Sequence, residues 1–140
     1  MRVLGILGIL MFLPECAAIA ASIPAPPDLR IVAPSPELPG EIAAFSGVWE
    51  GRWDGTLESR LAVERIDSGS ATVIYSWADS PQGRFKGGWV RVRATVLPGG
   101  KLRWGSNIQF TFEMAKDRMS IEGDRVAAGE SSMVTMRKAE

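Results

Sequence analysis

The chain has 140 residues, a length that fits one folded domain. Its 16 basic and 16 acidic residues cancel, so no overall charge attracts nucleic acid or a membrane surface. It contains no histidine and one cysteine, which excludes catalytic triads that use histidine and zinc sites built on histidine or cysteine.

Residues 1–20 are predicted to be a signal peptide. An uncharged apolar run, Val3–Leu13, follows a positively charged start, and Ala18 and Ala20 have the spacing that signal peptidase prefers. We place cleavage after Ala20, because the apolar run is too short to remain as a membrane span. The mature chain is then exported, periplasmic or extracellular, with neither a disulfide nor a transmembrane span. The alternative is a lipid anchor at Cys16, although Glu15 stands where a small residue is usual.

Residues 21–44 are predicted to be a proline-rich disordered tether. Six prolines fall between Pro24 and Pro39. Proline fixes φ and removes a backbone donor, so such a run favours extended, unpaired backbone. The segment either holds the domain away from a surface or a partner, or is a plain disordered leader. The folded domain is then residues 45–140.

The folded domain shows the two-residue alternation of β-strands. Apolar side chains occupy every second position in 108–114 and again in 90–96. Turn signals divide the domain into eight candidate strands, near 47–53, 57–66, 71–78, 89–97, 101–105, 108–115, 118–126 and 131–138. Short strands at this spacing suggest an antiparallel sandwich or barrel.

The hairpins must bring apolar faces together across each turn. A three-residue loop at 98–100 places Val96 opposite Leu102, and a similar loop at 67–69 places Val63 opposite Val73.

The other hairpins are less regular. Around 115–118, the same reasoning places Met114 opposite Met119 and Phe112 opposite Ile121. In the first hairpin we expect Trp49, Gly51 and Trp53 to point inward. The sequence does not indicate a register for the last hairpin, at 127–130.

Eight antiparallel strands joined by hairpins lose their exposed edges most simply by closing into an up-and-down barrel. The first strand carries Gly47-x-Trp49 and the last carries Arg137, a pattern that resembles the calycins: lipocalins, fatty-acid-binding proteins and avidins. The resemblance implies that Trp49 plugs the closed end of an eight-stranded barrel and that Arg137 packs over its indole. It covers the topology of the domain and three positions of the motif.

Alternate loops of an up-and-down barrel lie at the same end. The end opposite Trp49, which we call the mouth, is expected to hold the loops 54–56, 79–88, 105–107 and 127–130. Four tryptophans are predicted there: Trp53, Trp77, Trp89 and Trp104. The longest connection, 79–88, carries Arg84, Phe85 and Lys86 beside two glycines, and loops of this length are more often functional.

An aromatic collar under a loop suits a small apolar or aromatic ligand, because indoles offer large apolar area and one donor each. Avidin-like barrels use tryptophans at the mouth in this way, which is an analogy. The alternative is a lumen filled by its own side chains, since an eight-stranded barrel is just wide enough for them.

Six basic and no acidic residues lie between Ser80 and Phe112. Four of them, which we call the basic wall, are expected to face outward on neighbouring strands: Arg91, Arg93, Lys101 and Arg103. With loop 79–88, this wall gives the alternative function of an interaction or inhibitor module for an envelope component or a protein partner. A solvated barrel wall is the simpler interpretation. Nucleic acid is not an expected partner.

No catalytic constellation stands out in the sequence. Without histidine, acid–base chemistry would fall to carboxylates, Tyr75 or a lysine. Most carboxylates occupy strand positions expected to face outward, and we find no metal-ligand cluster, phosphate-binding loop or nucleophile motif. We therefore predict a secreted, non-catalytic binding protein with no metal and no cofactor.

Overall fold

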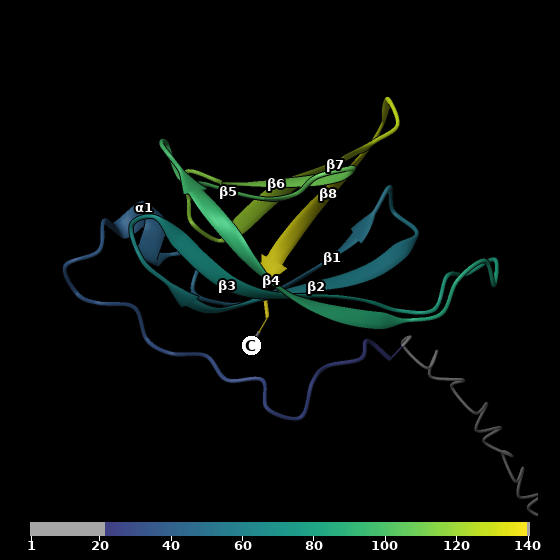
Figure 1. Ribbon diagram of the computed structural model, residues 1–140, viewed down its shortest axis with the longest axis horizontal. Helices are drawn as coiled ribbons and strands as arrows, with labels where there is room; N and C mark the ends of the chain where they lie inside the picture. Colours follow the sequence, from purple (N-terminus) through teal and green to yellow (C-terminus); the bar gives the residue numbers. More distant parts are fainter. Residues whose placement is uncertain (1–21, 140) are drawn as a thin grey trace, which may run out of the picture.

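The protein is described by a computed structural model that covers residues 22–139 (Figure 1). The predicted signal peptide and Cys16 lie outside the described residues. The regular secondary structure of the described chain is almost entirely β, and its eight antiparallel strands close into a barrel in up-and-down order. This confirms the predicted fold class. None of the helices in this range combines the length and the apolar character needed to cross a membrane.

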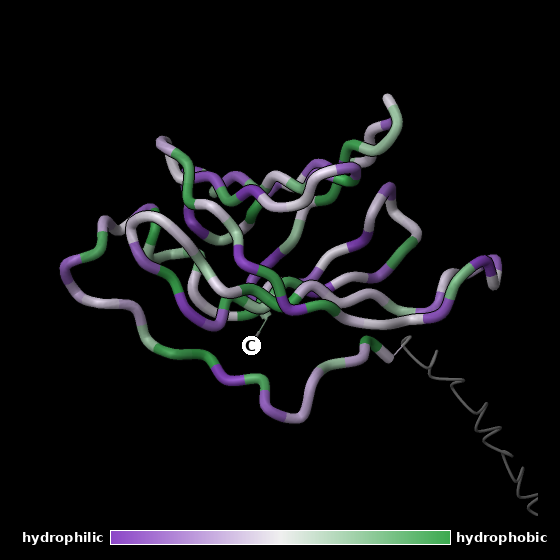
Figure 2. Tube along the Cα trace, in the orientation of Figure 1, coloured by the Kyte–Doolittle hydropathy of each residue, from purple (hydrophilic) through white to green (hydrophobic). Residues whose placement is uncertain are grey.

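Each strand pairs with its neighbours along the chain, and β1 pairs with β8 to close the barrel. One short helix precedes the strands. The elements are α1 (Gly40–Ala43), β1 (Gly47–Trp53), β2 (Leu57–Ile66), β3 (Ser70–Trp77), β4 (Gly88–Leu97), β5 (Lys101–Gly105), β6 (Ile108–Met114), β7 (Ser120–Ala127) and β8 (Glu130–Lys138). Hydropathy alternates along strands such as β4, as Figure 2 shows. The alternation sends one half of the side chains into a shared lumen.

Two predicted registers are confirmed: Val96 pairs with Leu102, and Val63 pairs with Val73. The inward orientation predicted for the tryptophans of the first strand is also confirmed, because Trp49 is fully buried and Trp53 is 5% exposed. The last hairpin is a two-residue turn, in which Ala128 and Gly129 both adopt positive φ, 49° and 80°. That geometry matches the right-handed twist of the flanking strands.

The register predicted for the β6–β7 hairpin is wrong by two residues. Phe112 pairs with Gly123, and Met114 pairs with Ile121. A Cβ atom on Gly123 would lie 2.4 Å from Cε1 of Phe112, so the ring of Phe112 occupies the space that a side chain would need. The glycine is therefore the partner that this large inward ring requires.

Side chains from several elements close the end of the barrel opposite the mouth. Ile42 of α1 and Leu38 just before it pack against the core. Trp49 belongs to the same core, and its Nε1 atom donates a hydrogen bond to the Phe45 carbonyl at 2.9 Å. This end of the lumen is closed by the chain that leads into β1.

The cation over Trp49 is Lys138, and the prediction for Arg137 is wrong. The Lys138 Nζ atom lies 5.2 Å from the centroid of the indole. On β8 the inward positions are those of Val134 and Met136, so Lys138 continues the series and Arg137 faces outward, exposed. A shift of one residue along a strand exchanges the two faces.

Residues 22–39, which we call the arm, run along the outside of the barrel beneath β2, β3 and β4 in Figure 1. The backbone N–H groups of Arg30 and Val32 donate to Glu64, at 3.1 Å to its Oε1 and 2.8 Å to its carbonyl. Arg91 bonds both Glu64, at 3.0 Å, and Asp28, at 2.9 Å. The hydrogen bond from Arg91 lowers the pKa of Asp28 below its ordinary value.

The arm differs from the free tether that the prolines predict. The outward-pointing side chains of Ala62 and Ile74 are fully buried, which requires a cover on the outer face of β2 and β3. The arm supplies that cover, because its extended proline-rich backbone can follow the strands while the N–H groups of Arg30 and Val32 bond to Glu64.

Candidate functional site

A cavity of about 700 Å³ opens at the mouth of the barrel. Its walls come from β1, β3, β6 and β7 and from the 79–88 loop, which the sequence places at this end. The lining includes Trp53, Tyr75, Trp77, Phe110, Arg125, Arg84, Phe85 and Lys86. The volume lies within the range of small-molecule pockets.

The rings of the lining form one connected cluster around Tyr75. Its ring centroid lies 4.8 Å from that of Phe110 and 5.7 Å from that of Trp77. Trp53 meets Phe110 edge to face at 5.9 Å. These contacts hold flat apolar surfaces in fixed positions around the cavity.

Trp104 belongs to the filled part of the lumen below the cavity. It is 8% exposed and stacks on both Phe110 and Phe112, with centroid separations of 5.0 Å and 5.4 Å. The lumen is therefore neither completely filled by side chains nor completely hollow. Its lower portion is packed by side chains, and its upper portion is hollow.

The tryptophan N–H groups differ in whether they have a hydrogen-bond partner. Trp49 donates to Phe45 and Trp77 donates to the Lys86 carbonyl at 3.0 Å. The buried Nε1 atom of Trp53 and the buried hydroxyl of Ser59 have no hydrogen-bond partner in the described chain. Both atoms are covered by protein, and Ser59 is not among the residues that line the mouth cavity, so a ligand in the cavity does not reach them directly.

The Tyr75 hydroxyl lies close to both unpartnered groups without forming well-aligned hydrogen bonds to them. Burial raises the pKa of Tyr75 above its ordinary value of 10.0. The phenol therefore stays protonated at neutral pH and can act as a further donor or acceptor at the floor of the cavity.

The 79–88 loop is an ordered extension of the β3–β4 hairpin. Ser80 and Phe85 bond to each other through two hydrogen bonds of 3.0 Å, and the Gly87 N–H donates to Asp79 at 2.7 Å. A Cβ atom on Gly87 would lie 2.9 Å from the Trp77 carbonyl. This glycine permits close backbone approach, and the loop is held in place at the rim of the mouth by these contacts.

Trp89, predicted to belong to the mouth collar, lies outside the barrel. It is 40% exposed and shares the outward face of β4 with Arg91, whose guanidinium carbon lies 6.0 Å from its ring centroid. The alternation that places Val90 and Val92 inward requires this orientation.

Tyr75, Phe110 and Arg125 line the cavity and are not among the predicted mouth residues, and of these three only Arg125 is charged. It lies on the inner face of β7, where it pairs with Phe110 across the β6–β7 ladder. The two-residue error in the predicted β6–β7 register does not change this face, whereas the unassigned last hairpin left this end of β7 without a predicted neighbour. The signal was Gly123, which faces Phe112 and so places Arg125, two residues later, on the same inward side.

The basic wall faces outward as predicted, and three of its four cations have polar partners. Arg91 pairs with Glu64 and Asp28, and Lys101 lies 3.8 Å from Glu113. Arg103 donates to the Thr111 hydroxyl at 3.3 Å. These contacts favour a solvated barrel wall, because much of its charge is already compensated.

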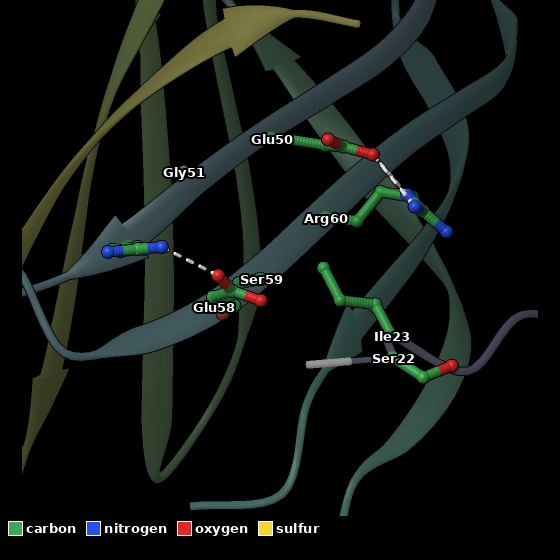
Figure 3. Close-up of a pocket in the computed structure, with 8 residues that line it drawn as sticks. Ser22, Ile23, Glu50, Gly51, Glu58, Ser59 and Arg60 are labelled. Atoms are coloured by element: carbon green, nitrogen blue, oxygen red, sulfur yellow. Dashed lines mark hydrogen bonds and ion pairs between the residues drawn. The ribbon is translucent and has the colours of Figure 1, made fainter. Parts of the chain in front are cut away.

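A second cavity, of about 500 Å³, lies on the outer wall where the arm meets β1 and β2 (Figure 3). Its charged side chains form two ion pairs, Arg60 with Glu50 at 2.7 Å and Arg52 with Glu58 at 2.8 Å. Within residues 22–139, no group of three or more His, Cys, Asp or Glu residues could hold a metal ion. The mouth cavity is the better candidate site.

The fold and the cavity define a small closed barrel with an aromatic-lined mouth, a form consistent with a calycin-like barrel. Comparison of the chain with protein-family models, curated proteins and solved structures found no match. The function is therefore argued from the geometry of the mouth.

Proposed function

We propose that this protein is an exported, non-catalytic binding protein that holds a small apolar or aromatic ligand in the mouth cavity. The observation that carries the proposal is a cavity of about 700 Å³ walled by fixed rings, among them those of Trp53, Tyr75 and Phe110. A ligand ring would bury apolar area against those walls.

The test is a titration of the purified domain with a panel of aromatic and acyl compounds, followed by tryptophan fluorescence. A ligand that shifts the emission is expected to bind about 5- to 10-fold more weakly to Trp77→Ala, which removes one ring from the cavity wall. Trp89→Ala is the matched control, since Trp89 lies outside the barrel. Equal affinity of both variants for every responding compound contradicts the proposal.

A protein partner at the 79–88 loop is the second candidate. Phe85 is 46% exposed at the rim, between Arg84 and Lys86. Replacing all three residues by alanine is expected to abolish co-purification of such a partner, and the interaction should weaken with salt. Unchanged co-purification would remove this candidate.

A further inference from the structure

The charges that line the mouth cavity do not balance. Three cationic side chains, Arg84, Lys86 and Arg125, share the lining with one carboxylate, that of Asp54. The Asp54 Oδ1 atom already accepts the backbone N–H of Met133 at 3.1 Å. The cavity therefore presents net positive charge to a molecule that enters it.

Arg125 is half-buried on the inner face of β7, beside Ser132 of β8. Across residues 22–139, its guanidinium has no carboxylate within ion-pair distance, whereas Arg52 and Arg60 each lie within 2.8 Å of one. A guanidinium that is partly withdrawn from water gains most from a bidentate anion, and a carboxylate matches its planar fork.

The walls near this charge are flat rings. The ring of Tyr75 is held between those of Trp77 and Phe110, and Trp53 closes the cluster from β1. Fixed rings bind another planar ring by offset stacking or edge contacts, with little loss of side-chain entropy. They favour an aromatic guest over a flexible acyl chain, which must lose rotational freedom on binding.

We infer that the ligand is an aromatic carboxylate, with its carboxylate paired to Arg125 and its ring against Tyr75. This inference rests on the proposed function and names the class of ligand for the same cavity. Arg84 and Lys86 at the rim add to the attraction of the anion at long range.

The test uses isothermal titration calorimetry with three probes: 4-hydroxycinnamate, its neutral methyl ester, and octanoate, an anion without a ring. The acid is expected to bind about 10-fold or more tightly than either of the others, since a hydrogen-bonded charge pair and the stacked ring each contribute on this scale. Arg125→Gln is expected to lower the affinity of the acid about 10-fold and to leave the ester unchanged.

Arg103→Gln is the matched control, because Arg103 lies on the outer wall and bonds Thr111. Far-UV circular dichroism checks that each variant is folded, and the comparison of acid with ester on the unaltered protein decides the question even if Arg125→Gln does not fold. Equal affinity for acid and ester overturns the carboxylate, and equal affinity for octanoate overturns the ring, while the proposed function stands in both cases. If none of the three probes binds at millimolar concentration, the proposed function fails as well.

Discussion

At the scale of single residues, one pair across β6 and β7 combines a large inward ring with a glycine. Gly123 lies opposite Phe112, and Cβ at this position would also lie 2.8 Å from Cγ1 of Val134. Phe112 in turn stacks on Trp104, which forms the upper limit of the packed region. The size of one side chain at the middle of β7 therefore influences where the packed lumen ends and the cavity begins.

Gly123→Ala tests this pairing. The added methyl group must displace the ring of Phe112 or the backbone of β7, so the free energy of unfolding is expected to fall by about 1–3 kcal/mol. Urea denaturation measures the change. Gly69→Ala is the control, because the nearest atom to its added Cβ would be Asp67 Oδ1 at 3.7 Å. Equal denaturation midpoints for the two variants would contradict the packing described for Phe112.

At the scale of elements, the arm and the barrel are joined by one buried carboxylate. Glu64 is 7% exposed and lies where the register between β2 and β3 shifts. That irregularity lets its backbone carbonyl and its side chain both accept hydrogen bonds from the arm. Arg91, from β4, holds the carboxylate in place at 3.0 Å. The arm is therefore attached through three segments that are distant in sequence.

Glu64→Gln is expected to loosen the arm and to leave the barrel closed. The amide keeps the shape of the side chain but removes the charge that Arg91 and the Arg30 N–H bind, a loss of about 1–3 kcal/mol. Hydrogen exchange at Arg30 should become about 10-fold faster, while exchange in β6 and β7 stays slow. Glu113→Gln, which removes the exposed partner of Lys101, serves as the control. Unchanged exchange at Arg30 would show that the arm is held by other contacts.

At the scale of the whole molecule, strand order and closure could be predicted because both follow from local signals. Alternation in 90–96 and 108–114 identifies a buried face, and turn residues mark the strand ends. Arg125, Lys138 and the docked arm could not be predicted in this way. Lys138 lies at the end of β8, where a shift of one residue exchanges the two faces. Arg125 lies near the last hairpin, for which the sequence indicates no register, and the arm depends on Glu64, 34 residues from Arg30.

Trp89 shows that strand parity decides which side of the barrel a side chain faces. The alternation that correctly predicts the inner face of β4 also predicts that Trp89 faces outward. Its predicted place at the mouth followed instead from its position near the other tryptophans. Proximity to one end of a barrel does not place a side chain inside it. The parity of the strand decides which of the residues near the mouth can line the cavity.

The two ends of the barrel are expected to differ in what they contribute to stability. Trp49 and Trp53 lie on the same strand and are both nearly inaccessible, but Trp49 packs below a closed end and bonds Phe45, while Trp53 borders a cavity with an unpaired donor.

Trp49→Ala is expected to cost about 3–5 kcal/mol, a large share of the stability of a domain of this size. Trp53→Ala should cost less, because the space it leaves joins an existing cavity and no protein hydrogen bond is lost. Thermal melts followed by far-UV circular dichroism compare the two, with exposed Trp89→Ala as the reference for a change near zero. A melting midpoint for Trp49→Ala equal to that of Trp89→Ala would show that the closed end is not sealed by this indole.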